Sequence, residues 1–482
     1  MSSRGIDLSV VVFAATIAAT FAAALIGRRH SRDIESAALS EHRLNKWLVG
    51  LSAGATANSG FVVTAVVGLG YTLGAHWVLL PLAWLLGDIV FWVFFPHRIN
   101  AAGRSIGAKT ITDLITHGLS PRLQQQLTRV IGICVIACLG GYVAAQWLAG
   151  QKFLDGAFGI SGAAGLAAFA AVIVCYTAIG GFRGSVYVDS MQAVIRIGGT
   201  VLALAAVAYV AIHNRTSFAQ NLHAAGTSFL QIVPGHAYWA AIPFILGFAA
   251  AALGFELGEP QMVSRYLAGA TPEETRSAWV IYNFFVQFTW VSMTIFGMLL
   301  RGVMPALADP EAGLSVFFRV QTGPILTGII TADVFATIAA TSNSLLVAMA
   351  QSTASDVFGK LGRRAEENWP ITAVLGAATM LVSLQLHGTV FNLALTSVSI
   401  LGAALAPAML VRLLGWRSTG ASITCSIAVG ATSAAAWHAL GLSSMMNEAA
   451  PGLILALTTN YLISRYWSGS NHGVLAKATS QA

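Results

Sequence analysis

The stretch Leu51-Ser-Ala-Gly-Ala-Thr-Ala-Asn-Ser-Gly60 places small polar residues in the middle of an apolar run that extends from Trp47 to Leu73. A helix that faces lipid has no use for them, and irregular backbone survives in hydrocarbon only where it lines a cavity. The sequence therefore predicts a helix that breaks around residues 55–58, whose freed carbonyls and nearby hydroxyls can hold an ion or a solute. Small residues that only allow close helix packing are the alternative.

Acidic side chains also fall inside apolar runs or at their ends, where a charge in lipid costs at least about 3 kcal/mol. They are Asp88, Asp189, Glu256, Glu259 and Asp333. We expect these groups to face the interior of a helix bundle or to lie near one of its ends.

Glu256 lies one turn before Pro260 in a second interrupted run, 236–260. A carboxylate at such a break can bind an amine or carry a proton. A carboxylate that is solvated, or paired with Arg265, fits the sequence equally well. Glu259 is next to Pro260, and we expect it to be solvated or to cap a helix.

Two of the remaining three acids, Asp189 and Asp333, lie toward the ends of their spans. Asp189 and Arg196 are two turns apart on one helical face, which favours a structural or gating role for Asp189 over substrate contact. Asp333 lies two turns before Thr341, where it can flank an entrance from outside the cell.

Tyr142 and Gln146 are one turn apart in the run 129–152 and can therefore share one face of a helix. The neighbouring Trp147 serves equally well as an interfacial anchor. His236, His387 and His438 are isolated from one another, and the four cysteines lie in apolar runs. No nucleophile–base arrangement or phosphate loop is visible, so we expect neither an enzyme nor a cofactor.

The composition indicates what must position these residues. The chain of 482 residues is 56% hydrophobic and 9% charged, with a mean hydropathy of +0.72. Soluble domains carry about 25% charged residues, so the chain is predicted to be an all-α polytopic membrane protein. The net charge of +7 comes from short loops, which argues against nucleic-acid binding.

About thirteen spans of at least ~20 residues fit the apolar runs. We expect them at 7–27, 46–73, 75–98, 129–152, 160–180, 186–213, 236–258, 276–301, 325–352, 369–386, 390–412, 421–441 and 450–467. The segment from Pro96 to Arg129 mixes charges with apolar residues at helical spacing and is expected to form short surface helices.

Basic residues predict the orientation. With these spans, 20 of the 26 Lys and Arg residues fall on one side of the membrane and five on the other, with Arg196 inside a span. The N-terminus is therefore expected outside and the C-terminus in the cytoplasm.

The two interrupted runs open two sets of five spans, 46–213 and 236–412. Because five is odd, the second set is inverted relative to the first, which is the arrangement of inverted-repeat transporters. Within a single membrane domain, 1–482, the helix at 7–27 and the pair at 421–467 are additions.

Four motifs together resemble the sodium:solute symporter family, whose members carry proline, sugars, pantothenate or sialic acid. The first motif, LSAGATANSG at 51–60 with GLGYTLG at 68–74, resembles the first core helix of that family. The second is YTAIGGFRGSVYVDSMQ at 176–192. The third, LGFELGEPQMVSRYLA at 253–268, resembles the second broken helix of the family, and the fourth, TIAATSNSLLVAMAQSTASDVF at 337–358, resembles its sodium-binding helix. The resemblance covers about residues 40–412 and implies a LeuT-type 5+5 inverted repeat and transport driven by a cation gradient.

The resemblance also implies sites. Na⁺, a hard cation, would be bound by the carbonyls of Ala55 and Asn58 and the hydroxyl of Thr341. The carbonyl of Thr337 or Ile338 would contribute, and Ala340 would lie beside Thr341. The residues expected to contact substrate are Ser59, Gly60, Tyr142, Gln146, Glu256 and Leu257.

The chain departs from the family pattern at three positions. Ala57 replaces the Asp of proline-transporting members, and Ala340-Thr341 keeps one of the two hydroxyls that many members have. Glu256 stands where members have an uncharged residue.

The sequence thus predicts a cation-coupled symporter, most simply Na⁺-coupled, that carries a small polar organic solute across the inner membrane of a bacterium by alternating access. Its expected partners are membrane lipid, the solute and Na⁺ or H⁺. One alternative is proton coupling through Glu256. Others are a transporter-like sensor without transport and, less simply, a channel.

Overall fold

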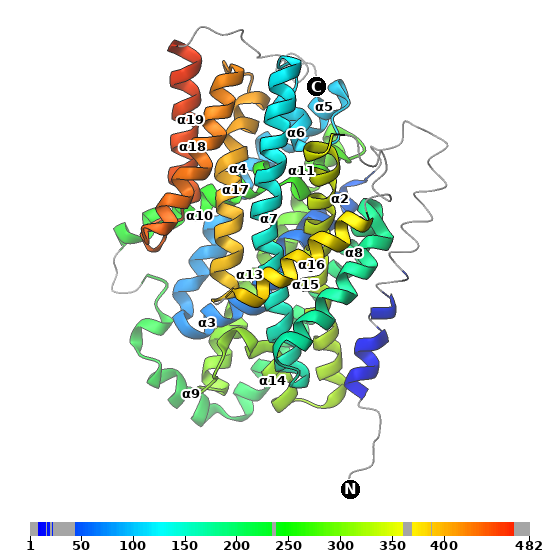
Figure 1. Cartoon of the computed structure of the whole chain (residues 1–482). Coiled ribbons are helices and arrows are strands. Elements are labelled where there is room, and N and C mark those ends of the chain that lie inside the picture. The colour runs from blue at the N-terminus through cyan, green and yellow to red at the C-terminus, as the bar shows by residue number, and fades with distance from the viewer. Residues whose placement is uncertain are drawn as a thin grey trace.

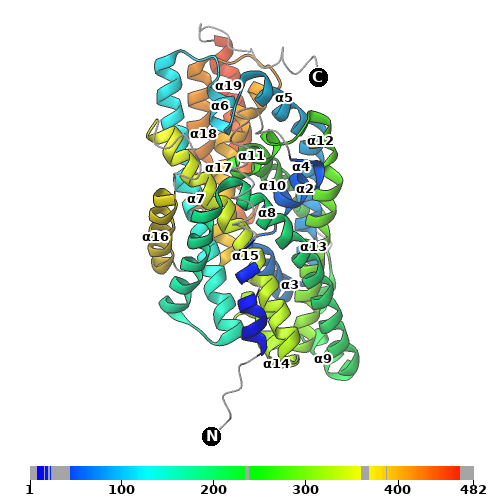
Figure 2. The same ribbon diagram turned by 90° about the vertical axis from the view of Figure 1, so that its right-hand side faces the viewer.

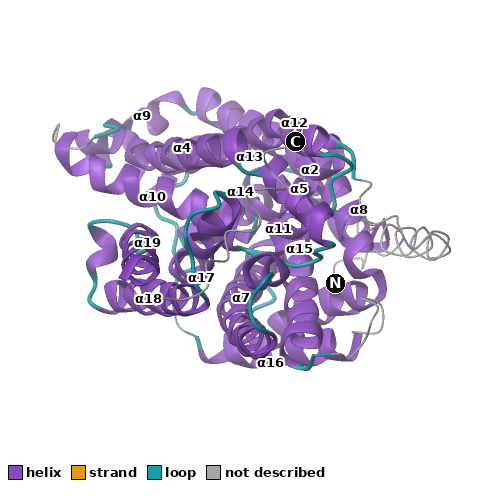
Figure 3. Ribbon diagram, turned by 90° about the horizontal axis from the view of Figure 1, so that it is seen from above, coloured by secondary structure: helices purple, strands orange, loops and turns teal. Residues whose placement is uncertain are grey.

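A computed structural model describes residues 8–15, 17–19, 22, 44–233, 238–359, 369–386 and 388–466, apart from the side chains at 179–184 and 240. Helices make up nearly all of this part (Figures 1 and 3), and one isolated bridge joins Leu44 to Gly269. Of the predicted span 7–27, the described residues are helical. The histidines at 236 and 387 lie outside the described residues.

The first half of the chain contains the following helices: α2 (Lys46–Ala57), α3 (Val67–Leu73), α4 (Leu79–Phe94), α5 (Pro96–Ile106), α6 (Ile111–Thr116), α7 (Pro121–Phe158), α8 (Gly162–His213) and α9 (Arg215–Ala224). The second half contains α10 (Tyr238–Gly258), α11 (Pro260–Leu267), α12 (Pro272–Ser277), α13 (Trp279–Val303), α14 (Gly313–Gln321), α15 (Pro324–Ser352), α16 (Trp369–Gln385), α17 (Val390–Leu413), α18 (Gly420–Ala439) and α19 (Ala449–Tyr466).

Seven described helices are long and apolar enough to cross a membrane by length and composition. Three shorter apolar helices, Leu8–Ala19, Gly162–Ala178 and Trp369–Gln385, accompany them, whereas α18 and α19 do not meet that criterion. Helix α4 illustrates the membrane-facing pattern: Leu82, Leu86 and Val93 are exposed on one side, and Asp88 is fully buried on the other. An exposed apolar stripe of this kind suits lipid rather than water.

The first predicted break is present. Helix α2 ends at Ala57, and Asn58 leaves helical geometry with a ψ of 70°. After Ser59 the chain resumes as a helical turn, a π-helical segment (Val62–Val66) and α3. Gly74, at a φ of 67°, then reverses the chain into α4, as its freedom at positive φ allows.

The second break lies at Glu259, whose backbone is extended between α10 and α11. Pro260 starts α11 at the first helical position, where its missing N–H costs nothing. Behind the break, Gly254 and Gly258 lie against Gly402 of α17, where an added Cβ would come within 3.3 Å and 3.0 Å of its Cα. These glycines let α10 and α17 cross closely.

Helix α8 covers both predicted spans, 160–180 and 186–213. Its 52 residues are helical throughout, so the two spans are joined without a loop. A straight helix of that length measures about 78 Å, against about 30 Å of hydrocarbon. Both of its ends lie at the end of the molecule that carries α9 and α14 (Figures 1 and 2), so its two halves run in opposite directions.

The opposite end of the molecule carries the predicted short surface helices, α5 and α6. There the strand-like residue Leu44 donates to Ala268 O (3.0 Å) and accepts from Ala270 N (2.8 Å). Asn100 of α5 donates to the carbonyls of Tyr266 and Gly269, each at 2.9 Å. The start of α2 and the end of α11 are therefore joined directly.

Candidate functional site

Helix α15 runs past the break in α2. The hydroxyl of Thr341 donates to Thr56 O (3.0 Å) and lies 3.4 Å from Ala55 O. One turn further on, Ser344 Oγ is 3.3 Å from Thr56 Oγ1. All of these residues are buried, so two helices distant in sequence bring several oxygens together at the break.

The remaining predicted cation ligands lie around this contact, and their role in binding an ion stays a prediction. Ala340 packs with Ala55 in a small buried cluster. Asn58 donates to Gly54 O (3.0 Å) and accepts from the Thr289 hydroxyl (2.5 Å). The hydroxyl of Thr337 instead donates to Asp333 O, and Ile338 O accepts from Ser342.

A narrow cavity lies beside the break, between both broken helices, α4, α7, α13 and α17. Half of its lining residues are aromatic and none is charged: Ala57, Ser59, Phe61, Leu80, Trp84, Tyr142, Phe248, Phe255, Trp290, Ala394, Leu395 and Val398. The open space is about 30 Å³, enough for little more than one water. A larger solute therefore requires the walls to separate.

Two predicted substrate residues, Ser59 and Tyr142, line this cavity together. Gln146 is buried one turn away and accepts from Gly60 N at 2.8 Å. Its Nε2 has no hydrogen-bond partner in the described part of the chain. The first helix break and α7 thus meet as expected.

Glu256 and Leu257 are not among the lining residues; the neighbouring Phe255 is. In this structure Glu256 therefore does not border the cavity as expected, and its carboxylate accepts a hydrogen bond from the Tyr266 hydroxyl. Leu257 is fully buried in the core. Neighbouring residues on a helix point about 100° apart. The position of a helix break can therefore be predicted correctly while the face that borders the cavity is not.

Behind Phe255, Glu256 shares the interior with a second carboxyl group, Asp88 of α4. Both are fully buried and close enough to interact electrostatically. Neither oxygen of Asp88 has a hydrogen-bond partner among the described residues, nor has Glu256 Oε1. Tyr266 and Tyr282 enclose the pair.

Asp189 and Asp333 each form a buried ion pair. Asp189, for which the sequence indicated no partner, lies 2.7 Å from Nη2 of Arg265. Arg196 pairs with Asp333 across α8 and α15 at 2.5 Å. Asp333 is therefore buried rather than open to an entrance, and Arg265 is not the partner of Glu256.

Glu259 is fully buried, not solvated, and accepts from Gln261 Nε2 at 2.8 Å. The expected helix-end position is right, but neighbouring helices cover it.

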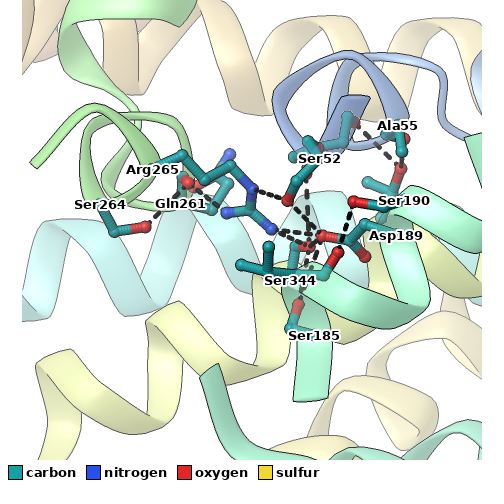
Figure 4. Close-up of polar contacts among 12 residues, drawn as sticks. Ser52, Ala55, Ser185, Asp189, Ser190, Gln261, Ser264, Arg265 and Ser344 are labelled. Carbon is teal, nitrogen blue, oxygen red and sulfur yellow. Dashed lines mark hydrogen bonds and ion pairs between the residues drawn. The ribbon is translucent and has the colours of Figure 1, made fainter. Parts of the chain in front are cut away.

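Figure 4 shows the polar network around Asp189, which joins α2, α8, α11 and α15 next to the first break. Arg265 donates through Nε to Ser52 Oγ (2.7 Å) and through Nη2 to Ser344 Oγ (2.6 Å). Ser52 donates to Asp189 at 2.9 Å, and Ser185 lies 3.3 Å from Ser344. A buried pair satisfied by several hydroxyls holds four helices in register.

Sequence reasoning missed the aromatic walls, above all Trp84 and Trp290. Aromatic residues in apolar runs usually pack or face lipid, so their type carries little information. One signal existed: Trp84 is one turn before Asp88, and a charge within a span must face inward, so Trp84 shares the inward face.

Comparison with known proteins identifies the family of this chain. A profile of the sodium:solute symporter family matches residues 38–422. The osmoregulated proline transporter OpuE of Bacillus subtilis is 24% identical over 458 residues, covering 90% of each chain. The sodium/proline symporter of Staphylococcus aureus is 23% identical over 459 residues, covering 89% of this chain and 86% of that one.

Solved structures agree on the fold. A Na⁺-coupled sialic acid symporter, in its substrate-bound outward-open state, matches with a TM-score of 0.75 at 15% identity, over 97% of this chain and 99% of the other. Mhp1, a nucleobase-cation-symport-1 family transporter in a closed conformation, matches with a TM-score of 0.55 at 13% identity, over 91% and 97%.

The chain shares the all-helical, multi-span fold of these symporters, and it belongs to the sodium:solute symporter family. The prediction of a polytopic membrane protein is thereby confirmed. So is the expectation that it is not an enzyme, because the relatives are transporters.

Proposed function

We propose that this protein couples the entry of Na⁺ to the uptake of a small solute across a bacterial plasma membrane. The observation that carries the proposal is the meeting of Thr341 with the carbonyl groups of Ala55 and Thr56 at the break in α2. A hard cation prefers several oxygens at such a break. The same break borders the aromatic cavity through Ala57 and Ser59, so ion and solute would share one element.

The proposed architecture is a LeuT-type inverted repeat of five helices each, 46–213 and 236–412, with about thirteen spans. The added helices are 7–27 and 421–467. The N-terminus would lie outside and the C-terminus in the cytoplasm, as the loop charges favour.

The proposed solute is a compact amino acid with an apolar body, and proline is the first candidate. Two observations support this choice: the named substrate of the relatives is proline, and the cavity walls are aromatic and uncharged. Backbone groups and hydroxyls at the break would then meet the carboxylate and the ammonium group. The amide of Gln146, next to Gly60, is a further donor at this place.

Uptake of radiolabelled proline by proteoliposomes tests both parts of the proposal. We expect accumulation under an inward Na⁺ gradient and none when K⁺ replaces Na⁺. If proline is not transported, a thermal-shift screen of amino acids, amines, monocarboxylates and sugars, with and without Na⁺, identifies another candidate solute. A ligand that stabilises the protein but is never transported would point to a sensor instead.

Proton coupling is the second candidate, and the Asp88–Glu256 pair favours it. Two carboxyl groups buried together without a basic partner among the described residues are most readily held with at least one proton. Glu256 follows the cavity-lining Phe255 directly along α10, so a change in the charge of the pair can affect the cavity wall. A pH gradient in place of the Na⁺ gradient would then drive uptake.

A further inference from the structure

A second, larger cavity lies away from the helix breaks, between the N-terminal helical residues and α7, α8, α14 and α15. Its volume is about 810 Å³, within the range of small-molecule sites. Four phenylalanines dominate its walls, and only Arg319, Thr322, Thr327 and Ser9 add polar groups. Figure 2 shows the N-terminal helix lying alongside α15 at this place.

The walls of this cavity are held by specific packing. Phe13 of the N-terminal helix contacts Phe335 and Phe158, with ring centres 5.3 Å and 5.4 Å apart. Phe169 completes the row at 5.7 Å from Phe335. Gly328 lets the N-terminal helix approach α15, since a Cβ there would lie 3.0 Å from the Cα of Ser9. The cavity is therefore a built feature between ordered helices.

Arg319 brings a positive charge to the rim of this apolar space. Its side chain is exposed, and its Nη1 donates to Asp155 O at 3.2 Å. No described carboxylate forms an ion pair with it. Lys152, at the same end of the molecule, is by contrast neutralised by Asp309 (2.6 Å) and Glu311 (3.0 Å). Arg319 thus keeps a charge and free donors next to an apolar wall.

An amphiphile with a long hydrocarbon tail and an anionic head matches this combination. The tail would fill the aromatic cavity, and a guanidinium group binds phosphate oxygens through paired, charge-assisted hydrogen bonds. We propose that an anionic phospholipid binds here, with an acyl chain in the cavity and its phosphate on Arg319. The lipid would join the N-terminal helix to α15, the helix that carries Thr341.

Lipid binding to the purified, delipidated protein tests this proposal. Dioleoyl-phosphatidylglycerol is added stepwise, and binding is followed by native mass spectrometry and by thermal unfolding. We expect one retained lipid per chain and an affinity that falls on the order of 10- to 100-fold in Arg319→Gln. Arg215→Gln, an exposed charge at the same end but outside the cavity, should bind like the wild type.

A second variant fills the cavity without touching the charge. Ala168 lines the cavity and is exposed, so Ala168→Trp should block lipid binding while leaving the fold intact. Ala171→Trp, exposed on the same helix but not in the lining, is the matched control.

Three results would overturn the proposal. Equal lipid retention by wild type, Arg319→Gln and Ala168→Trp would exclude the cavity as the site. Loss of binding in Ala168→Trp with no effect of Arg319→Gln, and equal binding of phosphatidylethanolamine, would remove headgroup recognition. A thermal shift produced equally by inorganic phosphate would indicate a simple anion site.

Discussion

At the scale of single residues, the hydroxyl of Thr341 has the most direct bearing on the proposed Na⁺ site. It contacts carbonyl groups that the end of α2 leaves without helical partners, whereas the hydroxyl of Thr337 on the same helix is used within α15. The two threonines are one turn apart and equally buried. Replacing each threonine in turn therefore distinguishes an effect at the helix break from an effect on the stability of α15.

We predict that Thr341→Ala raises the Na⁺ concentration needed for half-maximal uptake by roughly 5- to 150-fold, because removing one buried uncharged ligand costs about 1–3 kcal/mol. Thr337→Ala should leave the Na⁺ dependence close to that of the wild type. The measurement is uptake against Na⁺ concentration. An unchanged Na⁺ dependence in Thr341→Ala would place the site elsewhere or exclude Na⁺ as the ion.

A second residue-scale prediction concerns Glu256. If the Asp88–Glu256 pair carries a coupling proton, Glu256→Gln should stop uptake driven by a pH gradient and spare exchange of solute across the membrane. If Na⁺ alone is coupled, Glu256→Gln should keep Na⁺-driven uptake, since the side chain does not line the cavity. Asp88→Asn serves as the parallel variant. Loss of Na⁺-driven uptake with normal Na⁺ and solute binding would contradict both versions.

The candidate site could be predicted where local chemistry fixes the position, as at the glycine- and hydroxyl-rich break of 51–60. The partner of each buried charge could not. Asp189 and Arg196 share a helix, yet each pairs with a residue from a helix far away in sequence. Helical spacing gives the face of a residue but not the neighbour that the tertiary fold brings to it.

At the scale of helices, close crossings depend on glycine. An added Cβ at Gly87 of α4 would lie 2.2 Å from Ala249 O of α10, and at Gly297 of α13 it would lie 2.2 Å from Val67 O. Because the close atoms belong to the backbone, a side-chain rotation cannot relieve these contacts, and the helices themselves would have to move apart. Backbone-to-backbone approach of this kind is typical of membrane helices, where small residues permit close packing.

Gly198 and Gly199 of α8 offer an adjacent pair for testing such a contact. An added Cβ at Gly199 would lie 2.3 Å from the carboxylate of Asp333, whereas nothing lies within 4 Å of one at Gly198. We predict that Gly199→Ala displaces Asp333 from Arg196 and destabilises the protein by about 3–5 kcal/mol, as breaking a buried pair does. Gly198→Ala should be neutral or stabilising by up to about 1 kcal/mol. Thermal unfolding in detergent measures both, and equal stability of the two variants would contradict the packing argument.

Most helices could be predicted from apolar length, and the breaks from Gly, Pro and small polar residues. Between residues 180 and 186, glycines and an arginine suggest a loop, but helical hydrogen bonding continues where the two halves of α8 change direction (Figures 1 and 2). The free-energy cost of placing a few glycines in a helix is smaller than the cost of leaving buried backbone groups without hydrogen bonds. The exact count of thirteen spans stays a prediction.

At the scale of the whole molecule, the two ends differ in what they carry. Arg122 lies in the first turn of α7, at the end of the molecule that carries α5 and α6. The next residue, Leu123, packs against Gly420 at the start of α18. Arg215 begins α9, which packs on the last turn of α13 through Asn221 and Gly302 at the other end. The exposed residue Ala308 follows in the connection to α14.

Reporter fusions or cysteine labelling can test the orientation of these ends. Labels at Arg122 and Arg417 should report the cytoplasm, and labels at Arg215 and Ala308 the outside. An inward report at Arg215 would contradict the inverted relation of the two sets of helices, because it would change the parity of the spans between them.

The bridge between Leu44 and the Gly269 region bears on the order of assembly. Leu44 is synthesised long before Gly269, so its amide and carbonyl must wait for Ala268 and Ala270. The contacts of Asp189 with Arg265 and of Thr56 with Thr341 also join distant parts of the chain. Contacts between distant segments form late, because closing the intervening chain costs entropy first. The N-terminal half can therefore insert during synthesis, but its broken helix acquires its final surroundings only after the C-terminal half has arrived.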